Sequence, residues 1–143
     1  MGPFYPWFHF IHVAAAFWLA AGVFASTVVR AQGRRTTEPA ARALAARLLW
    51  RLHVVFTLPG LLAAGFLGFY LVAAGGFRFG ETWVLAAAFL YLLMFLSTLF
   101  AVTPGLARQR TAAVPLAEKL PSIASDVNAL IILILACLMV VKP

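Results

Sequence analysis

The chain has few acidic residues and almost no cysteine. Aspartate and glutamate together number 4, against 11 lysines and arginines, and the one cysteine is Cys137. A single cysteine excludes an intrachain disulfide and any metal site built from several cysteines. The net charge of +7 is compatible with either nucleic acid or anionic lipid as a partner, and the positions of the basic residues decide between the two.

Charged residues of either sign make up only 10% of the chain, whereas 64% is hydrophobic and the mean hydropathy is +0.99. A soluble domain of 143 residues could not bury that much apolar surface. Stretches of the roughly 20 apolar residues that a helix needs to cross a bilayer run over about residues 6–29, 40–74, 82–107 and 121–141. Alternation of period two is absent, which argues against a transmembrane barrel. The sequence therefore predicts one all-α integral membrane domain over residues 1–143, a four-transmembrane-helix bundle.

The basic residues gather on one side of these spans. Two connections and the start of the second span carry Arg30, Arg34, Arg35, Arg42, Arg47, Arg51, Arg108, Arg110 and Lys119. By the positive-inside rule, this distribution places both termini outside and the basic loops in the cytoplasm, with the protein in the inner (cytoplasmic) membrane. Basic loops beside anionic lipid explain such charge, so lipid and not nucleic acid is the predicted partner.

Histidine is the residue type that carries the functional prediction. His12 lies in a long uncharged run, and an ionisable side chain at hydrocarbon depth usually faces a partner, a cofactor or a cavity. Imidazole is also a common ligand of haem iron. His9 precedes His12 by three residues and shares its helix face, so the two cannot hold one iron from opposite sides. We expect His12 to be an axial ligand or, alternatively, a structural histidine hydrogen-bonded to a carbonyl in the bundle interior. His9 is a weaker candidate ligand or a residue of the interfacial aromatic belt.

His53 marks a second position, close to the opposite interface. The helical rise puts His12 roughly 25 Å above the basic interface and His53 about 3 Å inside it. The two are therefore not expected to bind one iron within a single chain. Asp126 starts from the same side as His53, and a His53–Asp126 pair would satisfy two groups that are costly alone. The pair would be a proton relay or inner polar site; alternatively His53 is a second haem ligand and Asp126 only caps the fourth helix.

Small residues recur along the first two spans, at Gly22, Ser26, Gly60, Ala64, Gly65 and Gly68. Such faces allow close approach of helix backbones in lipid. They predict a homodimer, in which equivalent helices could supply the second axial ligand.

Three segments are similar to a known family. The run Trp7–His12 is similar to an opening W-x-K-x-x-H with His12 on the family histidine, and Leu48–Pro59 resembles the start of the family's second helix. Val140–Pro143 resembles a V-V-K-P ending, which places Asp126 on a family glutamate. The chain in this way resembles HemJ-type membrane proteins and, more broadly, the CopD-like group of small helical bundles, including its uncharacterised integral membrane branch.

The resemblance implies a haem b-binding, cytochrome b-like membrane protein with a redox or tetrapyrrole-handling role, such as protoporphyrinogen oxidation, and with His12 at the haem. The family's third helix opens with W-x-H-x-K, whereas this chain reads Trp83–Ala87 with neither polar residue. An oxidoreductase would also need a redox partner. Two other functions stay open: a cofactor-free accessory subunit of a larger membrane complex, and a copper- or metal-handling membrane protein.

Overall fold

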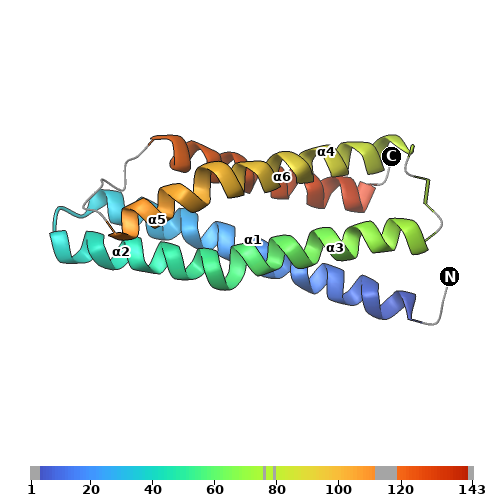
Figure 1. The fold of residues 1–143 in the computed structure, drawn as a ribbon, viewed down its shortest axis with the longest axis horizontal. Helices are drawn as coiled ribbons and strands as arrows, with labels where there is room; N and C mark the ends of the chain where they lie inside the picture. The colour runs from blue at the N-terminus through green and yellow to red at the C-terminus, as the bar shows by residue number, and fades with distance from the viewer. Residues whose placement is uncertain (1–3, 76, 79, 112–118, 142–143) are drawn as a thin grey trace.

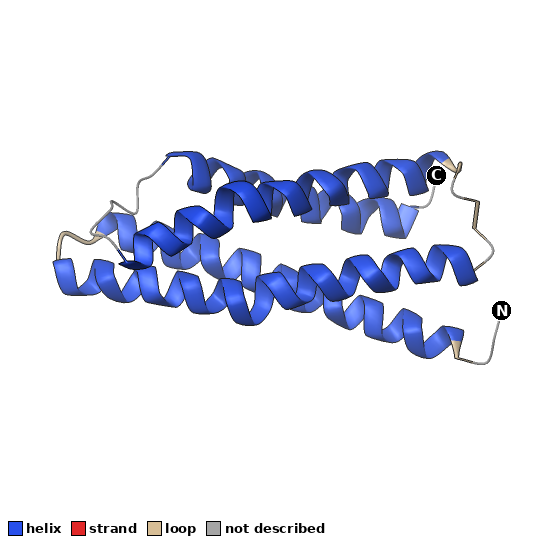
Figure 2. Cartoon of the chain, in the orientation of Figure 1, coloured by secondary structure: helices blue, strands red, loops and turns tan. Residues whose placement is uncertain are grey.

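The computed structural model describes residues 4–75, 77–78, 80–111 and 119–141, so the last two residues of the V-V-K-P-like ending lie outside it. Within the described residues the chain is helical and has no strand (Figure 2). Four helical rods are each long and apolar enough to cross a membrane: Tyr5–Arg35, Pro39–Ala74, Thr82–Thr111 and Lys119–Val141. They lie side by side as one bundle (Figure 1), which confirms the predicted all-α fold with four spans.

The second and third rods share an interruption. Each contains one turn of π-helix between two α-helices. In chain order the elements are α1 (Tyr5–Arg35), α2 (Pro39–Leu52), η1 (His53–Thr57), α3 (Leu58–Ala74), α4 (Thr82–Ser97), η2 (Thr98–Val102), α5 (Thr103–Thr111) and α6 (Lys119–Val141).

Each π turn is followed, after one intervening residue, by a proline. Pro59 follows η1 and has no N–H to donate to the Val55 carbonyl four residues earlier. The indole Nε1 of Trp18, on α1, donates to that carbonyl at 2.9 Å. Pro104 follows η2 in the same way. Proline and wide helical turns therefore occur together at one level of two neighbouring rods, and π turns are frequent at functional sites.

α1 is longer than the hydrophobic stretch that predicted it. The prediction ended near residue 29, but the helix continues through Gly33 to Arg35 and ends where Thr36 becomes extended. Arg30 lies inside this extension and is buried, because its guanidinium donates to the Pro121 carbonyl of α6. Hydropathy falls at the first arginine, whereas the helix ends only where its backbone hydrogen bonding ends.

The small residues of the first two rods pack against each other within one chain. A Cβ added to Gly60 would lie 2.7 Å from the Leu19 nitrogen, and one added to Gly22 would lie 2.6 Å from the Phe56 Cβ. These glycines let α1 cross the second rod almost backbone to backbone. The faces are therefore used inside the bundle, and a homodimer, which stays a prediction, would need another surface.

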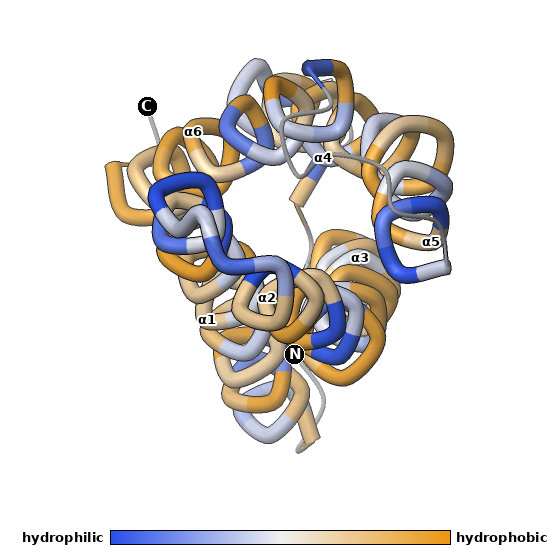
Figure 3. The backbone as a smooth tube through the Cα atoms, turned by 90° about the vertical axis from the view of Figure 1, so that its left-hand side faces the viewer, coloured by the Kyte–Doolittle hydropathy of each residue, from blue (hydrophilic) through white to orange (hydrophobic). Residues whose placement is uncertain are grey.

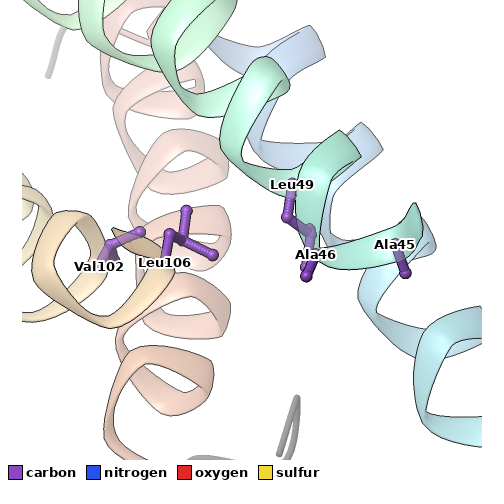
Figure 4. Packing of buried hydrophobic residues seen from close by; sticks show 5 residues of the cluster. All are labelled: Ala45, Ala46, Leu49, Val102 and Leu106. Carbon is purple, nitrogen blue, oxygen red and sulfur yellow. The ribbon is translucent and has the colours of Figure 1, made fainter. Parts of the chain in front are cut away.

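Two apolar clusters hold the rods together. The first joins α2 to the third rod and contains Ala45, Ala46, Leu49, Val102 and Leu106 (Figure 4). The second, which we call the apolar layer, joins α1, α3, α4 and α6 and contains Leu19, Val23, Leu61, Met94 and Ile131. The largest apolar side chains point outward instead: Phe66 and Phe100 are 77% and 76% exposed. Such exposure is what a lipid-facing surface requires.

The bundle has two different ends. α1 begins and α6 ends at one of them, whereas α1 ends, α2 begins, α5 ends and α6 begins at the other, the connection end (Figure 1). Hydrophilic residues gather at the connection end, as the end-on view in Figure 3 shows. We call this the basic end, since every described arginine and lysine except Arg78 lies at or near it.

Candidate functional site

The bundle buries polar side chains in its half nearest the basic end. Seven of them surround a small cavity and are called the polar site here: Ser26, Arg30, His53, Thr57, Thr98, Ser125 and Asn128. All seven are buried. A buried polar group in a lipid-embedded bundle must find a partner, so such a cluster marks a place of function more often than of simple packing.

All four rods contribute to the polar site. Ser26 and Arg30 lie one turn apart on α1, and Ser125 and Asn128 lie one turn apart on α6. His53 is the first residue of η1, and Thr98 is the first residue of η2. The two π turns therefore bring their leading side chains to the same cavity.

A chain of hydrogen bonds fixes the state of the His53 ring. The Thr103 hydroxyl donates to the Thr98 carbonyl at 2.7 Å, so its only hydrogen is used there. His53 Nε2 lies 2.9 Å from the same Thr103 oxygen and must therefore be the donor in that contact. The ring therefore carries its hydrogen on Nε2, and in the neutral imidazole Nδ1 would then have the lone pair; no hydrogen bond joins Nδ1 to another described residue.

Only one of the two polar atoms of the Asn128 side chain has a hydrogen-bond partner among the described residues. Its Nδ2 donates to the Thr98 hydroxyl oxygen at 3.0 Å, but its buried Oδ1 has no donor. The cavity beside these groups has a volume of about 10 Å³, which is room for about one water molecule. The site therefore combines an imidazole lone pair, an amide oxygen without a donor, and space for a single small donor.

Arg30 and Asp126 lie at the edge of the polar site nearest the basic end. Arg30 is 4% exposed and donates to the Pro121 carbonyl at 3.1 Å. Asp126 is exposed, and its electrostatic interaction is with Arg30. His53 contacts Thr103 and Asp126 interacts with Arg30, so these contacts do not include the His53–Asp126 pair, which was one of two alternatives from the sequence.

His12 lies in the other half of the bundle, 8% exposed, between α1 and α3. The ring packs against Gly68, where an added Cβ would lie 3.1 Å from its Cε1, and makes a polar contact with the backbone of Ala64. Its Nδ1 is enclosed and has no hydrogen-bond partner. His9 is exposed, and its ring stacks at 6.4 Å from that of Tyr5.

The apolar layer separates His12 from the polar site. Along α1, Leu19 and Val23 come between His12 and Ser26, and those 14 residues span roughly 21 Å of helix. Along the second rod, Leu61 comes between His53 and Gly68. The two histidines therefore belong to different sites, one on each side of the layer.

Neither histidine is placed to hold a haem in the packed chain. The enclosed His12 Nδ1 has no space in front of it for iron and porphyrin, and the cavity beside His53 holds about one water. Within the described residues no three His, Cys, Asp or Glu side chains lie together as a metal site, and Cys137 is exposed. A metal-handling function thus has no ligand cluster in this part of the chain.

Sequence reasoning did not single out Arg30, Thr98, Thr103 or Asn128 as site residues. One signal could have pointed to Thr98: it precedes a Pro-Gly step by six residues, as His53 does in the second rod. Pro59-Gly60 and Pro104-Gly105 thus mark equivalent levels of two rods.

Comparison with known proteins places the chain among integral membrane proteins. Residues 7–143 match a family described as "Predicted integral membrane protein (DUF2269)". No curated protein and no solved structure matches the chain. The match supports the integral membrane branch of the expected relationship, while the likeness to HemJ-type and CopD-like proteins stays a resemblance.

Proposed function

We propose that this chain, which belongs to the DUF2269 family of predicted integral membrane proteins, transfers protons inside the membrane. His53 is the proton acceptor in this proposal. The observation that carries this proposal is the bare Nδ1 of His53 beside a water-sized cavity in the polar site. A water molecule in that cavity would donate to Asn128 Oδ1 and would carry a proton to the imidazole.

The chemistry of the polar site favours a proton over a metal ion. Arg30 contributes a positive charge to the cavity lining, which disfavours a multiply charged metal ion strongly and would make a proton held on His53 easy to release. A cation would also need several oxygen or nitrogen ligands, whereas a proton needs one lone pair and one water. An imidazole with one N–H donated and the other nitrogen free meets that requirement.

The arrangement of the bundle would let a proton reach the polar site from the basic end only. The polar site lies toward the basic end, and the apolar layer closes it from the half of the bundle that contains His12. The positive-inside rule would place the basic end in the cytoplasm. A site that takes up protons from one side would suit a redox reaction in the membrane or an accessory subunit of a larger complex.

Infrared difference spectroscopy between neutral and acidic pH tests this proposal on the protein in lipid vesicles. We expect an imidazole protonation signal that disappears in His53→Gln and persists in His9→Gln, the control with an exposed ring. Asn128→Leu should weaken or slow the signal, because the bridging water loses its acceptor. A spectrum that is the same in His53→Gln as in the unchanged protein would exclude His53 as the proton acceptor.

Haem b binding at His12 is the second candidate function. Its support is the unpaired, buried Nδ1, the kind of group that a ligand satisfies. Bound haem would supply one-electron redox chemistry, consistent with a redox or tetrapyrrole-handling role. Because that nitrogen is enclosed in the packed chain, haem would require α1 and α3 to separate around Gly68.

Ultraviolet–visible spectra of the purified protein, oxidised and then dithionite-reduced, test this second function. Haem at His12 predicts a Soret band that is lost in His12→Ala and retained in His9→Ala and His53→Gln. A colourless protein that takes up no added haem would remove this candidate and leave the proton-transfer proposal intact.

A further inference from the structure

A groove with three arginines lies at the basic end, apart from the polar site. It has a volume of about 440 Å³ and is lined by Arg47, Trp50 and Arg51 of α2 and by Arg110 of α5. The three α2 residues share one helix face by their spacing. The Arg110 guanidinium lies 5.5 Å from the centre of the Trp50 ring, a cation–π contact that fixes one wall of the groove.

No described side chain neutralises the positive charges of Arg47 and Arg51. Neither arginine makes a hydrogen bond or ion pair with another described residue. Of the described acids, Glu38 lies at the start of α2, nine residues before Arg47, and Asp126 lies near Arg30. Glu81 lies at the start of α4, at the opposite end of the bundle (Figure 1). Three guanidinium groups around one space repel each other, and a bound anion would relieve that repulsion.

The two helices that form the groove are packed together, and the groove lies at the depth of the lipid headgroups. Leu49 and Leu106 belong to the apolar cluster that joins α2 to α5. Tryptophan and arginine prefer the level of the lipid headgroups, and His53, two residues beyond Arg51, is already inside the bundle. The groove therefore lies where a bilayer presents its phosphates.

An apolar strip continues from the groove along the same rod, toward the middle of the bundle. Val54 and Val55 are exposed and follow Arg51 by three and four residues. A free phosphate would make no use of these valines, whereas the acyl chains of a phospholipid would cover them. This neighbourhood favours a lipid as the source of the phosphate.

We propose that the groove is a binding site for an anionic phospholipid, with its phosphate held between Arg47, Arg51 and Arg110 and its acyl chains against the exposed Val54 and Val55. Arginine is suited to this role because its planar fork donates two hydrogen bonds to one phosphate. The site is independent of proton transfer at His53.

Native mass spectrometry of the protein released from detergent, with added phosphatidylglycerol or phosphatidylcholine, tests the site. We expect preferential retention of phosphatidylglycerol, and an apparent Kd that rises about fivefold for each of Arg47→Gln, Arg51→Gln and Arg110→Gln. Arg35→Gln is the matched control, because it removes one exposed charge from the same end outside the groove. Circular dichroism of each variant verifies that its helix content is unchanged.

Three results would overturn the proposal. An equal loss of phosphatidylglycerol in Arg35→Gln would mean that general charge attracts the lipid and that the groove has no special role. Equal retention of phosphatidylcholine would remove the preference for an anionic lipid. Displacement of phosphatidylglycerol by micromolar inorganic pyrophosphate, with direct binding of pyrophosphate, would assign the groove to a soluble phosphate compound.

Discussion

Replacing Gly60 with alanine should lower the free energy of unfolding by about 3 kcal/mol. Alanine is intrinsically the better helix former by about 1 kcal/mol, so helix propensity alone predicts the opposite sign. The steric term is larger, because the new methyl group would lie 2.7 to 2.9 Å from the nitrogen, Cα and Cβ of Leu19. Backbone atoms cannot rotate away, so α1 and the second rod would have to separate.

Unfolding of the purified protein in mixed micelles, followed by circular dichroism as the denaturing detergent increases, measures this effect. Gly80→Ala is the control, since a Cβ at that position meets nothing within 4 Å. A Gly60→Ala protein as stable as the unchanged protein would contradict the close crossing of α1 and α3.

The second large effect is expected at Thr98. Thr98→Val keeps the shape of the side chain but removes the oxygen that accepts from Asn128, and it leaves a buried amide N–H unpaired. We expect a loss of about 2 kcal/mol in the free energy of unfolding. Adding Asn128→Leu should recover much of that loss, because the double variant leaves neither partner unsatisfied.

The same micelle titration applied to the two single variants and the double variant gives the coupling energy between these positions. Simple additivity of the two single effects would show that Thr98 and Asn128 do not interact across the bundle. Both variants that carry Asn128→Leu should also show the weakened or slowed infrared signal of His53, even where the double variant recovers its stability.

The features that depend on distance along a helix, namely the four spans and the separation of His12 from His53, could be predicted from the sequence. A span needs about 20 apolar residues, so hydropathy located four rods. The fixed helical rise also predicted separate levels for His12 and His53, and the structure places the apolar layer between them. The extension of α1 beyond residue 29 was missed because Arg30 is buried through a bond to the distant Pro121, which no local pattern reveals.

It was harder to predict which neighbouring helix each side chain faces. His53 and Asp126 start from the same end of the bundle, but the His53 ring contacts Thr103 of the third rod, and no one-dimensional pattern predicts which rod a side chain faces. Similarly, Gly22 and Gly60 indicated close helix contact without saying which helices meet. Thr98 and Asn128 gave weak signals, since uncharged polar residues are common enough in membrane helices to escape notice.

The most direct test of the central claim is ¹⁵N NMR of the histidine side chains in lipid bilayers. With three histidines, His53→Gln and His9→Gln are sufficient to assign every ring. Proton transfer at His53 predicts a neutral Nε2–H tautomer with a bare Nδ1, which becomes protonated when the sample is acidified. An Nδ1–H tautomer at His53, or an Nδ1 that stays bare when the sample is acidified, would contradict it.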